Sequence, residues 1–126
     1  MVLAIRDVRE HDLDAVLALN NAAGRSILAL DSARLRYFYE HAEYFRVAEV
    51  DGHLAGFLIA LRDGGEYDSP NYRWFGEHYP QFMYIDRIVI ANAYHRHGLG
   101  RVLYCDVHSY AEVRVPLLTC EVLLEP

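Results

Sequence analysis

Lysine is absent from this sequence, and all 12 of its basic Lys or Arg residues are arginine. A chain without lysine cannot form a lysine Schiff base. It also cannot contain the Gly-Lys-Ser/Thr segment that a Walker A phosphate-binding loop requires. This one absence therefore excludes two common kinds of enzyme chemistry.

Cysteines and long apolar segments are scarce as well. Cys105 and Cys120 do not have C-x-x-C spacing, and we expect reduced thiols, with Cys105 packed as a small apolar residue. The longest apolar run, Leu54 to Leu61, has eight residues, whereas a membrane-spanning helix needs about 20. The N-terminal segment reaches charge at Arg6, too early for the apolar core of a signal peptide. These absences predict a cytoplasmic protein with no membrane partner.

The composition of the chain is typical of one soluble domain over residues 1–126. Of the 126 residues, 53% are hydrophobic and 24% are charged, which is enough to bury one core without disulfides or metal. The net charge is −6, from 18 acidic and 12 basic residues. Because a nucleic-acid backbone requires a basic surface, this balance argues against a nucleic-acid partner and favours cationic ones.

The spacing of apolar residues predicts both strands and helices. Strands are expected over residues 2–7, 45–50, 54–61, 82–90 and 117–124. Helices are expected over about 10–23, 31–44 and 99–113. Asp51-Gly52 predicts a type I′ hairpin turn, and residues 62–80 are expected to form a long loop that covers a site. These elements predict an α/β fold with a sheet of mixed direction. The last strand is expected to be parallel to strand 82–90, because a helix connects the two strands.

The strongest motif is the segment between strand 82–90 and the helix that follows it. A glycine-containing turn at a helix N-terminus brings unpaired N–H groups to the positive end of the helix dipole, which favours phosphate binding. Gly98 and Gly100 have no side chains to keep a diphosphate from the backbone. Local positive charge comes from His95, Arg96, His97 and Arg101. The alternative interpretation is that the two glycines only ease helix entry and close packing.

This segment resembles the acyl-CoA signature of the GNAT superfamily of N-acyltransferases. The signature is Gln/Arg-x-x-Gly-x-Gly/Ala, and the segment reads His95-Arg96-His97-Gly98-Leu99-Gly100. The order of predicted elements is similar to that of the family over almost the whole chain. The resemblance implies a mixed, mostly antiparallel central sheet with helices on both faces. It also implies an N-acetyltransferase that passes an acetyl group from acetyl-CoA directly to a primary amine.

The same resemblance implies roles for individual residues. The loop amides would hold the CoA diphosphate, and the fourth strand would pair with pantetheine and polarise the acyl carbonyl. The residues concerned are Ile88, Val89, Ile90, His95, Arg96, His97, Gly98, Leu99, Gly100 and Arg101.

The chain is expected to be short at its C-terminus, because the family normally continues past its fifth strand with a further helix and strands. Three interpretations stay open: a fragment, a form completed by another copy, or a form with little activity. A homodimer would cover the exposed edge strand of such a sheet. A non-catalytic acyl-CoA-binding or interaction domain is the alternative to an enzyme.

An acidic residue on an otherwise apolar strand is the candidate catalytic base. Acyl transfer requires a neutral amine and so a base within reach of it. Asp86 lies twelve residues before Gly98, where many relatives have an acid. An ion pair with a nearby arginine is the alternative role. Tyr84 lies two residues earlier on the same strand face, where it would bind substrate or fill the core.

The acceptor site is expected to combine acids and aromatic residues. Residues 62–80 contain both and suit a cationic amine, although a solvated surface loop has the same composition. By the resemblance, Asn20, Asn21 and Arg25 lie at the other wall of this site. The histidines do not form a closed set of ligands, so no metal is expected.

Overall fold

A five-stranded sheet divides the helices into two groups. The computed structural model describes residues 1–24 and 27–120. Its elements are, in order, β1 Leu3–Asp7, a 3₁₀ turn Glu10–Asp12, α1 Leu13–Asn21, α2 Ser32–His41, β2 Tyr44–Val50, β3 His53–Arg62, α3 Pro70–His78, β4 Met83–Ile90, a 3₁₀ turn Asn92–Tyr94, α4 Leu99–Glu112 and β5 Leu118–Cys120.

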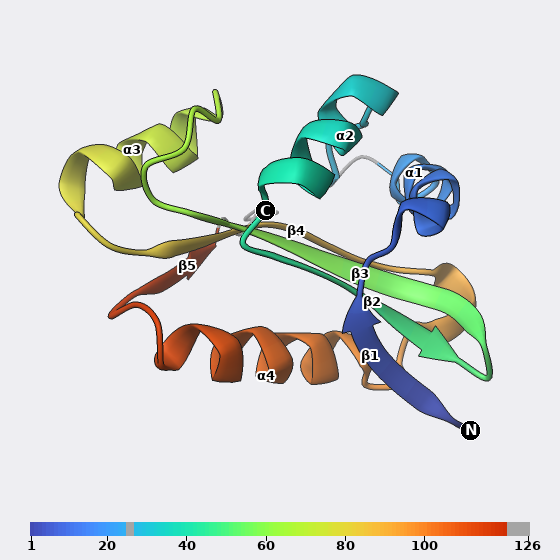
Figure 1. The fold of residues 1–126 in the computed structure, drawn as a ribbon. Helices are drawn as coiled ribbons and strands as arrows, with labels where there is room; N and C mark the ends of the chain where they lie inside the picture. The colour runs from blue at the N-terminus through green and yellow to red at the C-terminus, as the bar shows by residue number, and fades with distance from the viewer. Residues whose placement is uncertain (25–26, 121–126) are drawn as a thin grey trace, which may run out of the picture.

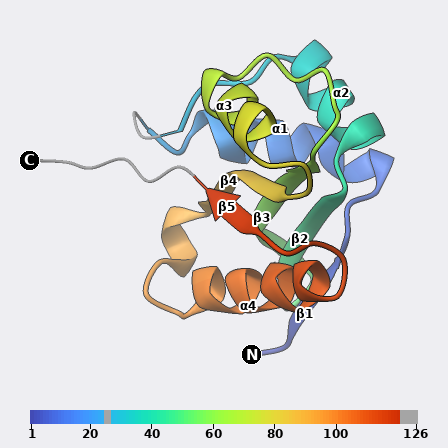
Figure 2. The same ribbon diagram turned by 90° about the vertical axis from the view of Figure 1, so that its left-hand side faces the viewer.

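The strands lie in the order β1-β2-β3-β4-β5. The first four are antiparallel to their neighbours, whereas β5 is parallel to β4. Helices α1, α2 and α3 cover one face of the sheet and α4 covers the other (Figures 1 and 2). The predicted mixed, mostly antiparallel sheet with helices on both faces is confirmed.

Local sequence signals account for most of these elements. Asp51 and Gly52 both have positive φ angles, 51° and 82°, as the predicted type I′ turn requires. Helix α4 buries residues three or four positions apart, which face the sheet: Leu99, Leu103, Val107 and Ala111. The spacing that predicted this helix is therefore the spacing of its buried face.

Residues 62–80 are not simply a loop, because they contain α3. The Ser69 side chain accepts a hydrogen bond from Tyr72 N, and Pro70 occupies the first turn. Both residues are typical of the start of a helix.

Two other predicted elements differ in length from the observed ones. The helix expected to reach residue 44 ends at His41, and Tyr44 instead opens β2 as a buried residue. Of the strand predicted over 117–124, residues 118–120 form β5, and 121–124 lie outside the described residues.

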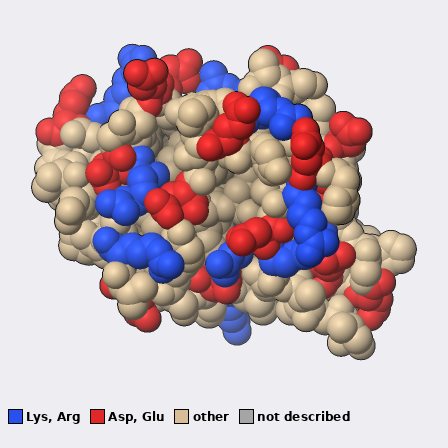
Figure 3. All heavy atoms as spheres, in the orientation of Figure 1, with Lys and Arg blue, Asp and Glu red and all other residues tan. Residues whose placement is uncertain are grey.

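Charges of both signs are interspersed on the face drawn in Figure 3. Several form ion pairs between elements, such as Arg36 with Glu10 and Arg46 with Asp7. None of the helices in the described part of the chain combines the length and apolar character needed to cross a membrane.

Candidate functional site

The turn that leads into α4 contains two residues with left-handed backbone. Arg96 has a φ of 69° and Gly98, directly before α4, has a φ of 79°. A Cβ at Gly98 would meet no atom within 4 Å, so the backbone conformation and not packing favours glycine there. Gly100 also faces open space. Close packing therefore explains neither glycine of the motif.

The first turn of α4 leaves main-chain donors free. Val102 N donates to Gly98 O at 3.1 Å. The N–H groups of Leu99, Gly100 and Arg101 precede this bond, and helix geometry provides no partner for them. Together with the positive end of the helix dipole, these groups can bind an anion such as phosphate.

A groove of about 680 Å³ opens at this point. It is lined by Ile88, Ile90, Tyr94, His95, Arg96, Gly98, Leu99, Gly100, Arg101 and Tyr104. A second hollow of about 530 Å³ shares Arg101 and Tyr104 and continues along α4 past Cys105. The groove volume lies in the range of cofactor and substrate sites.

Cys105 is exposed, so the expectation that it packs as an apolar residue is wrong.

Two residues predicted for this site do not line the groove. His97 instead lies near Tyr94, with 6.4 Å between their ring centroids. The Val89 side chain is buried among the residues that pack under α1, α2 and α3. The other predicted cofactor-binding residues meet at the groove.

The edge of β4 beside the groove is not paired with another described strand, and one of its acceptors, the carbonyl oxygen of Ile90, lies 2.8 Å from His95 Nε2. Ala91 N donates to Ala55 O at 2.8 Å, and because antiparallel pairs alternate, Val89 also turns its main chain toward β3. The main-chain groups of Ile88 and Ile90 therefore point to the opposite edge. Over the described residues, β5 pairs only with the first part of β4, from Met83 to Ile85. No described strand covers the edge at Ile88 and Ile90.

A β-bulge changes the direction of side chains in β4. Ile59 pairs with Arg87 and Ala60 pairs with Ile85, so Asp86 is an extra residue on β4. Such a bulge interrupts the alternation of faces. As a result, the consecutive residues Asp86 and Arg87 both face α1, α2 and α3.

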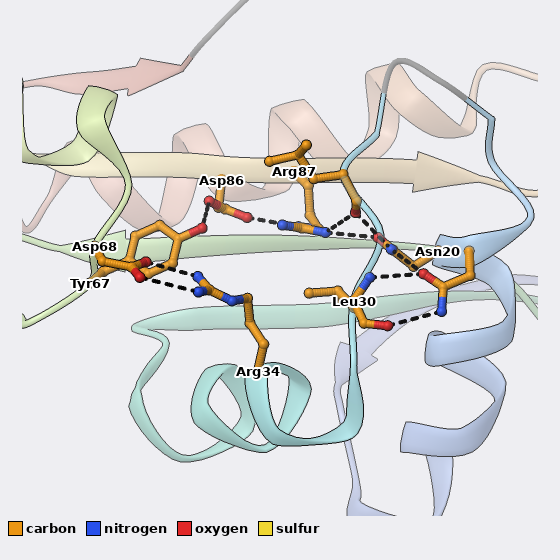
Figure 4. A network of polar contacts seen from close by, with 9 residues as sticks. Asn20, Leu30, Arg34, Tyr67, Asp68, Asp86 and Arg87 are labelled. Atoms are coloured by element: carbon orange, nitrogen blue, oxygen red, sulfur yellow. Dashed lines mark hydrogen bonds and ion pairs between the residues drawn. The ribbon is translucent and has the colours of Figure 1, made fainter.

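Asp86 is held on both of its carboxylate oxygens (Figure 4). Tyr67 Oη donates to Asp86 Oδ1 at 2.5 Å, and Arg87 Nε donates to Asp86 Oδ2 at 2.7 Å. The side chains of Asp86 and Arg87 are each only 5% exposed. The structure thus contains the ion pair that was the alternative role for Asp86.

The network continues to the segment between α1 and α2. Arg87 Nη1 donates to Asn20 Oδ1 at 3.1 Å and to Leu28 O at 2.8 Å. Asn21 exchanges hydrogen bonds with the main chain of Leu30, at 2.9 and 3.0 Å. The predicted acceptor-site residues Asn20 and Asn21 therefore hold this segment, whereas Arg25 lies outside the described residues.

Tyr84 lies in the core, 2% exposed. Its ring packs edge-to-face on Tyr72, with centroids 5.8 Å apart, and tilted against Phe75 at 6.0 Å. This is the core-filling role that was one of its two expected roles.

Sequence reasoning did not single out Tyr67 or the pairing partner Arg87. Tyr67 is 19 residues from Asp86 along the chain, and only its place in a segment rich in acids and aromatics could have drawn attention to it. Three acids of that segment, Glu66, Asp68 and Glu77, are exposed, whereas Asp63 is half-buried. In the described part of the chain, no three His, Cys, Asp or Glu side chains are grouped as a metal site.

Comparison with known proteins gives a family match. A family model described as "Acetyltransferase (GNAT) family" matches residues 7–120. A search among curated proteins gave no significant match.

Solved structures have the same fold. A transcriptional regulator from Bacillus halodurans C-125 is 16% identical, with a TM-score of 0.72 over 97% of this chain and 83% of the other. A possible acetyltransferase from Clostridium difficile 630 is 16% identical, with a TM-score of 0.74 over 99% and 82%. An aminoglycoside N-acetyltransferase in complex with CoA is 12% identical, with a TM-score of 0.68 over 97% and 78%. At these identities the likeness is one of fold.

Proposed function

The chain belongs to the acetyltransferase (GNAT) family, the acyl-CoA-dependent N-acetyltransferases, and we propose that residues 1–126 act as one domain that transfers an acetyl group from acetyl-CoA to a primary amine. One observation carries this proposal. Leu99, Gly100 and Arg101, whose N–H groups have no partner within α4, line a groove of about 680 Å³, at two glycines that no packing contact requires.

The start of α4 would bind the diphosphate of acetyl-CoA, the donor substrate. The N–H groups of Leu99, Gly100 and Arg101 are the hydrogen-bond donors in this proposal. Hydrogen bonds to a charged group contribute about 1.5–3 kcal/mol each. Arg96 and His95 line the same groove, and the Arg96 guanidinium adds positive charge to it.

The edge of β4 would bind the pantetheine arm. The main-chain groups of Ile88 and the N–H of Ile90 point to this edge, whereas the carbonyl oxygen of Ile90 already contacts His95 Nε2. Extended ligands pair with such edges through main-chain hydrogen bonds. Val89 faces β3 and would contribute only by holding its two neighbours in place. An N–H on the same edge would polarise the acetyl carbonyl, as oxyanion-binding groups do.

Asp86 is the proposed base. The amine nitrogen forms a bond to the acetyl carbon, the carbon–sulfur bond breaks, and CoA leaves as a thiolate while the amine proton passes to Asp86, directly or through water. No covalent enzyme intermediate is required. A carboxylate has about four lone pairs, and the contacts to Tyr67 and Arg87 use two of them. Tyr84, the second predicted catalytic residue, would act only through the core, because its ring packs on Tyr72, which also contacts Tyr67.

An acetyl-transfer assay tests the proposal. Release of free CoA thiol is followed with acetyl-CoA and a panel of polyamines, aminoglycosides, amino acids and peptides with free N-termini, while calorimetry measures CoA binding. Turnover with at least one amine supports the enzyme. Binding of CoA without turnover across the panel would indicate the non-catalytic acyl-CoA-binding or interaction domain. The similarity in fold to an aminoglycoside N-acetyltransferase places aminoglycosides first in the panel.

A further inference from the structure

Tyr67 is fixed in place by its neighbours. Its side chain is buried, 7% exposed. Its ring packs edge-to-face on Phe38 at 5.5 Å and on Tyr72 at 5.6 Å, and Arg34 Cζ lies 5.4 Å from the ring centroid. Since the ring cannot swing freely, the position of its hydroxyl is set by the packing.

The Tyr67 hydroxyl is a permanent hydrogen-bond donor. Burial, and next the negative charge of Asp86, raise the pKa of Tyr67 above its usual value. The phenol therefore keeps its proton at every pH at which a protein of this kind works. Its partner is the carboxylate oxygen Oδ1 of Asp86, 2.5 Å away.

The other side of Asp86 is held just as firmly. Arg87 Nε donates to Oδ2, and Arg87 Nη1 donates to Asn20 Oδ1 and to the carbonyl oxygen of Leu28. Arg87 Cζ also lies 5.4 Å from the ring centroid of Phe38. Asp86 is thus clamped between a segment before α3 and the segment that joins α1 to α2, as Figure 4 shows.

We propose that Tyr67 is a positioning residue for acetyl transfer: its hydroxyl, opposite the Arg87 guanidinium, holds the Asp86 carboxylate in one orientation at the β4 bulge. The remaining lone pairs of the carboxylate then point in one fixed direction. This inference rests on the proposed function, because it requires that Asp86 receives the proton of the amine.

The molecule contains a matched control on the opposite face of the sheet. Tyr44 Oη donates to Asp106 Oδ2 at 2.7 Å, and Arg46 Nη1 donates to the same oxygen at 2.7 Å. Tyr44 is buried, 2% exposed. This second Tyr–Asp–Arg group has the same chemistry as the first, but it joins β2 to α4 and has no part in the proposed reaction.

The experiment compares Tyr67→Phe with Tyr44→Phe. Each change removes one hydroxyl from a carboxylate that an arginine also holds. Both variants are expected to lose stability, measured as Tm, with the larger loss in Tyr67→Phe, because the Asp86 side chain is 5% exposed and that of Asp106 is 29% exposed. Tyr67→Phe is expected to lower kcat roughly tenfold, because a misplaced reacting group is costly, while the Kd for CoA stays within twofold. Tyr44→Phe is expected to keep kcat within twofold. Rates are expressed per CoA-binding molecule, so an unfolded fraction does not count.

A double variant separates the inference from the proposed function. If Tyr67 acts through Asp86, adding Tyr67→Phe to Asp86→Asn lowers kcat no further than Asp86→Asn alone. If Asp86→Asn lowers kcat but Tyr67→Phe leaves it within twofold, the positioning role is overturned while the base is kept. An equal loss of kcat in Tyr44→Phe would overturn it as well. If Asp86→Asn leaves kcat unchanged, the role of Asp86 fails and the inference fails with it.

Discussion

His95 Nε2 lies 2.8 Å from the carbonyl oxygen of Ile90, five residues earlier in the chain. Ile90 is the last residue of β4, and its carbonyl points to the edge that faces the groove. The imidazole therefore occupies this acceptor and joins the end of the strand to the turn before α4. The contact also bears on the departure from the family signature, which has Gln or Arg where this chain has His95.

The first prediction concerns that contact. A glutamine side chain places an amide N–H donor at a reach similar to Nε2 of histidine, so His95→Gln is expected to leave the Kd for CoA within twofold. His95→Ala removes the donor, and a lost hydrogen bond of about 1 kcal/mol corresponds to a rise in Kd of about fivefold. Calorimetry with CoA measures both. Equal affinity of the alanine variant and the unaltered protein would contradict the positioning of this turn by His95.

The second prediction concerns the glycine that precedes α4. Gly98→Glu is expected to abolish CoA binding, because it places bulk and negative charge beside the free N–H groups. Gly64 is a suitable control, since it also has a positive φ angle, 84°, and open space around its Cβ position. Gly64→Glu introduces the same backbone strain away from the groove and is expected to retain the affinity for CoA. Loss of binding in both variants would mean that strain and not the anion site is responsible.

The third prediction concerns the proposed base. Asp86→Asn keeps an oxygen that can accept from Tyr67 or Arg87 but removes the negative charge. Turnover is expected to fall by roughly 10²–10⁴-fold, the usual contribution of a general base, with little change in the Kd for CoA. If the variant instead loses stability and keeps full activity per folded molecule, Asp86 serves only as the partner of Arg87.

The fourth prediction concerns stability at low pH. Hydrogen bonds from Arg6 Nη1 and Nη2, at 2.8 and 2.9 Å, are the largest of several causes that lower the pKa of Asp12 in the folded protein below its ordinary value of 3.8. A depressed folded-state pKa contributes stability that is present above pH 3.8 and is lost as the pH falls toward the folded value. Asp12→Asn lacks this contribution.

Urea unfolding at pH values from about 2.5 to about 6 measures the effect. The free energy of unfolding of the unaltered protein is expected to fall more steeply below about pH 4 than that of Asp12→Asn. Parallel curves for the two proteins would exclude a role for Asp12 in the acid sensitivity of the fold.

Several parts of the fold follow from short-range signals in the sequence. The turn at Asp51-Gly52 needs two adjacent residues that tolerate positive φ angles, and this dipeptide supplies them. The buried face of α4 follows from apolar residues three or four positions apart. The glycine turn at the start of α4 was also predictable, because a helix N-terminus and its amides without an intrahelical partner are made by consecutive residues.

Helix α3 shows the limit of that approach. Its apolar residues are few and mixed with polar ones, so periodicity alone favours a loop. Only the cap made by Ser69 and the proline at residue 70 point to a helix start. The helix is stabilised by packing, because Tyr72 and Phe75 contact the core between the sheet and α1, α2 and α3.

The sequence by itself determined the order of the elements other than α3, the hairpin turn and the glycine motif, because each depends on neighbours within a few positions. Only the tertiary structure decided that Asp86 and Arg87 share one face, since this follows from the register between β3 and β4. The partners of these two residues, Tyr67 and Asn20, are 19 and 67 positions away from them. Such contacts depend on how distant segments pack, which no local pattern of residues encodes.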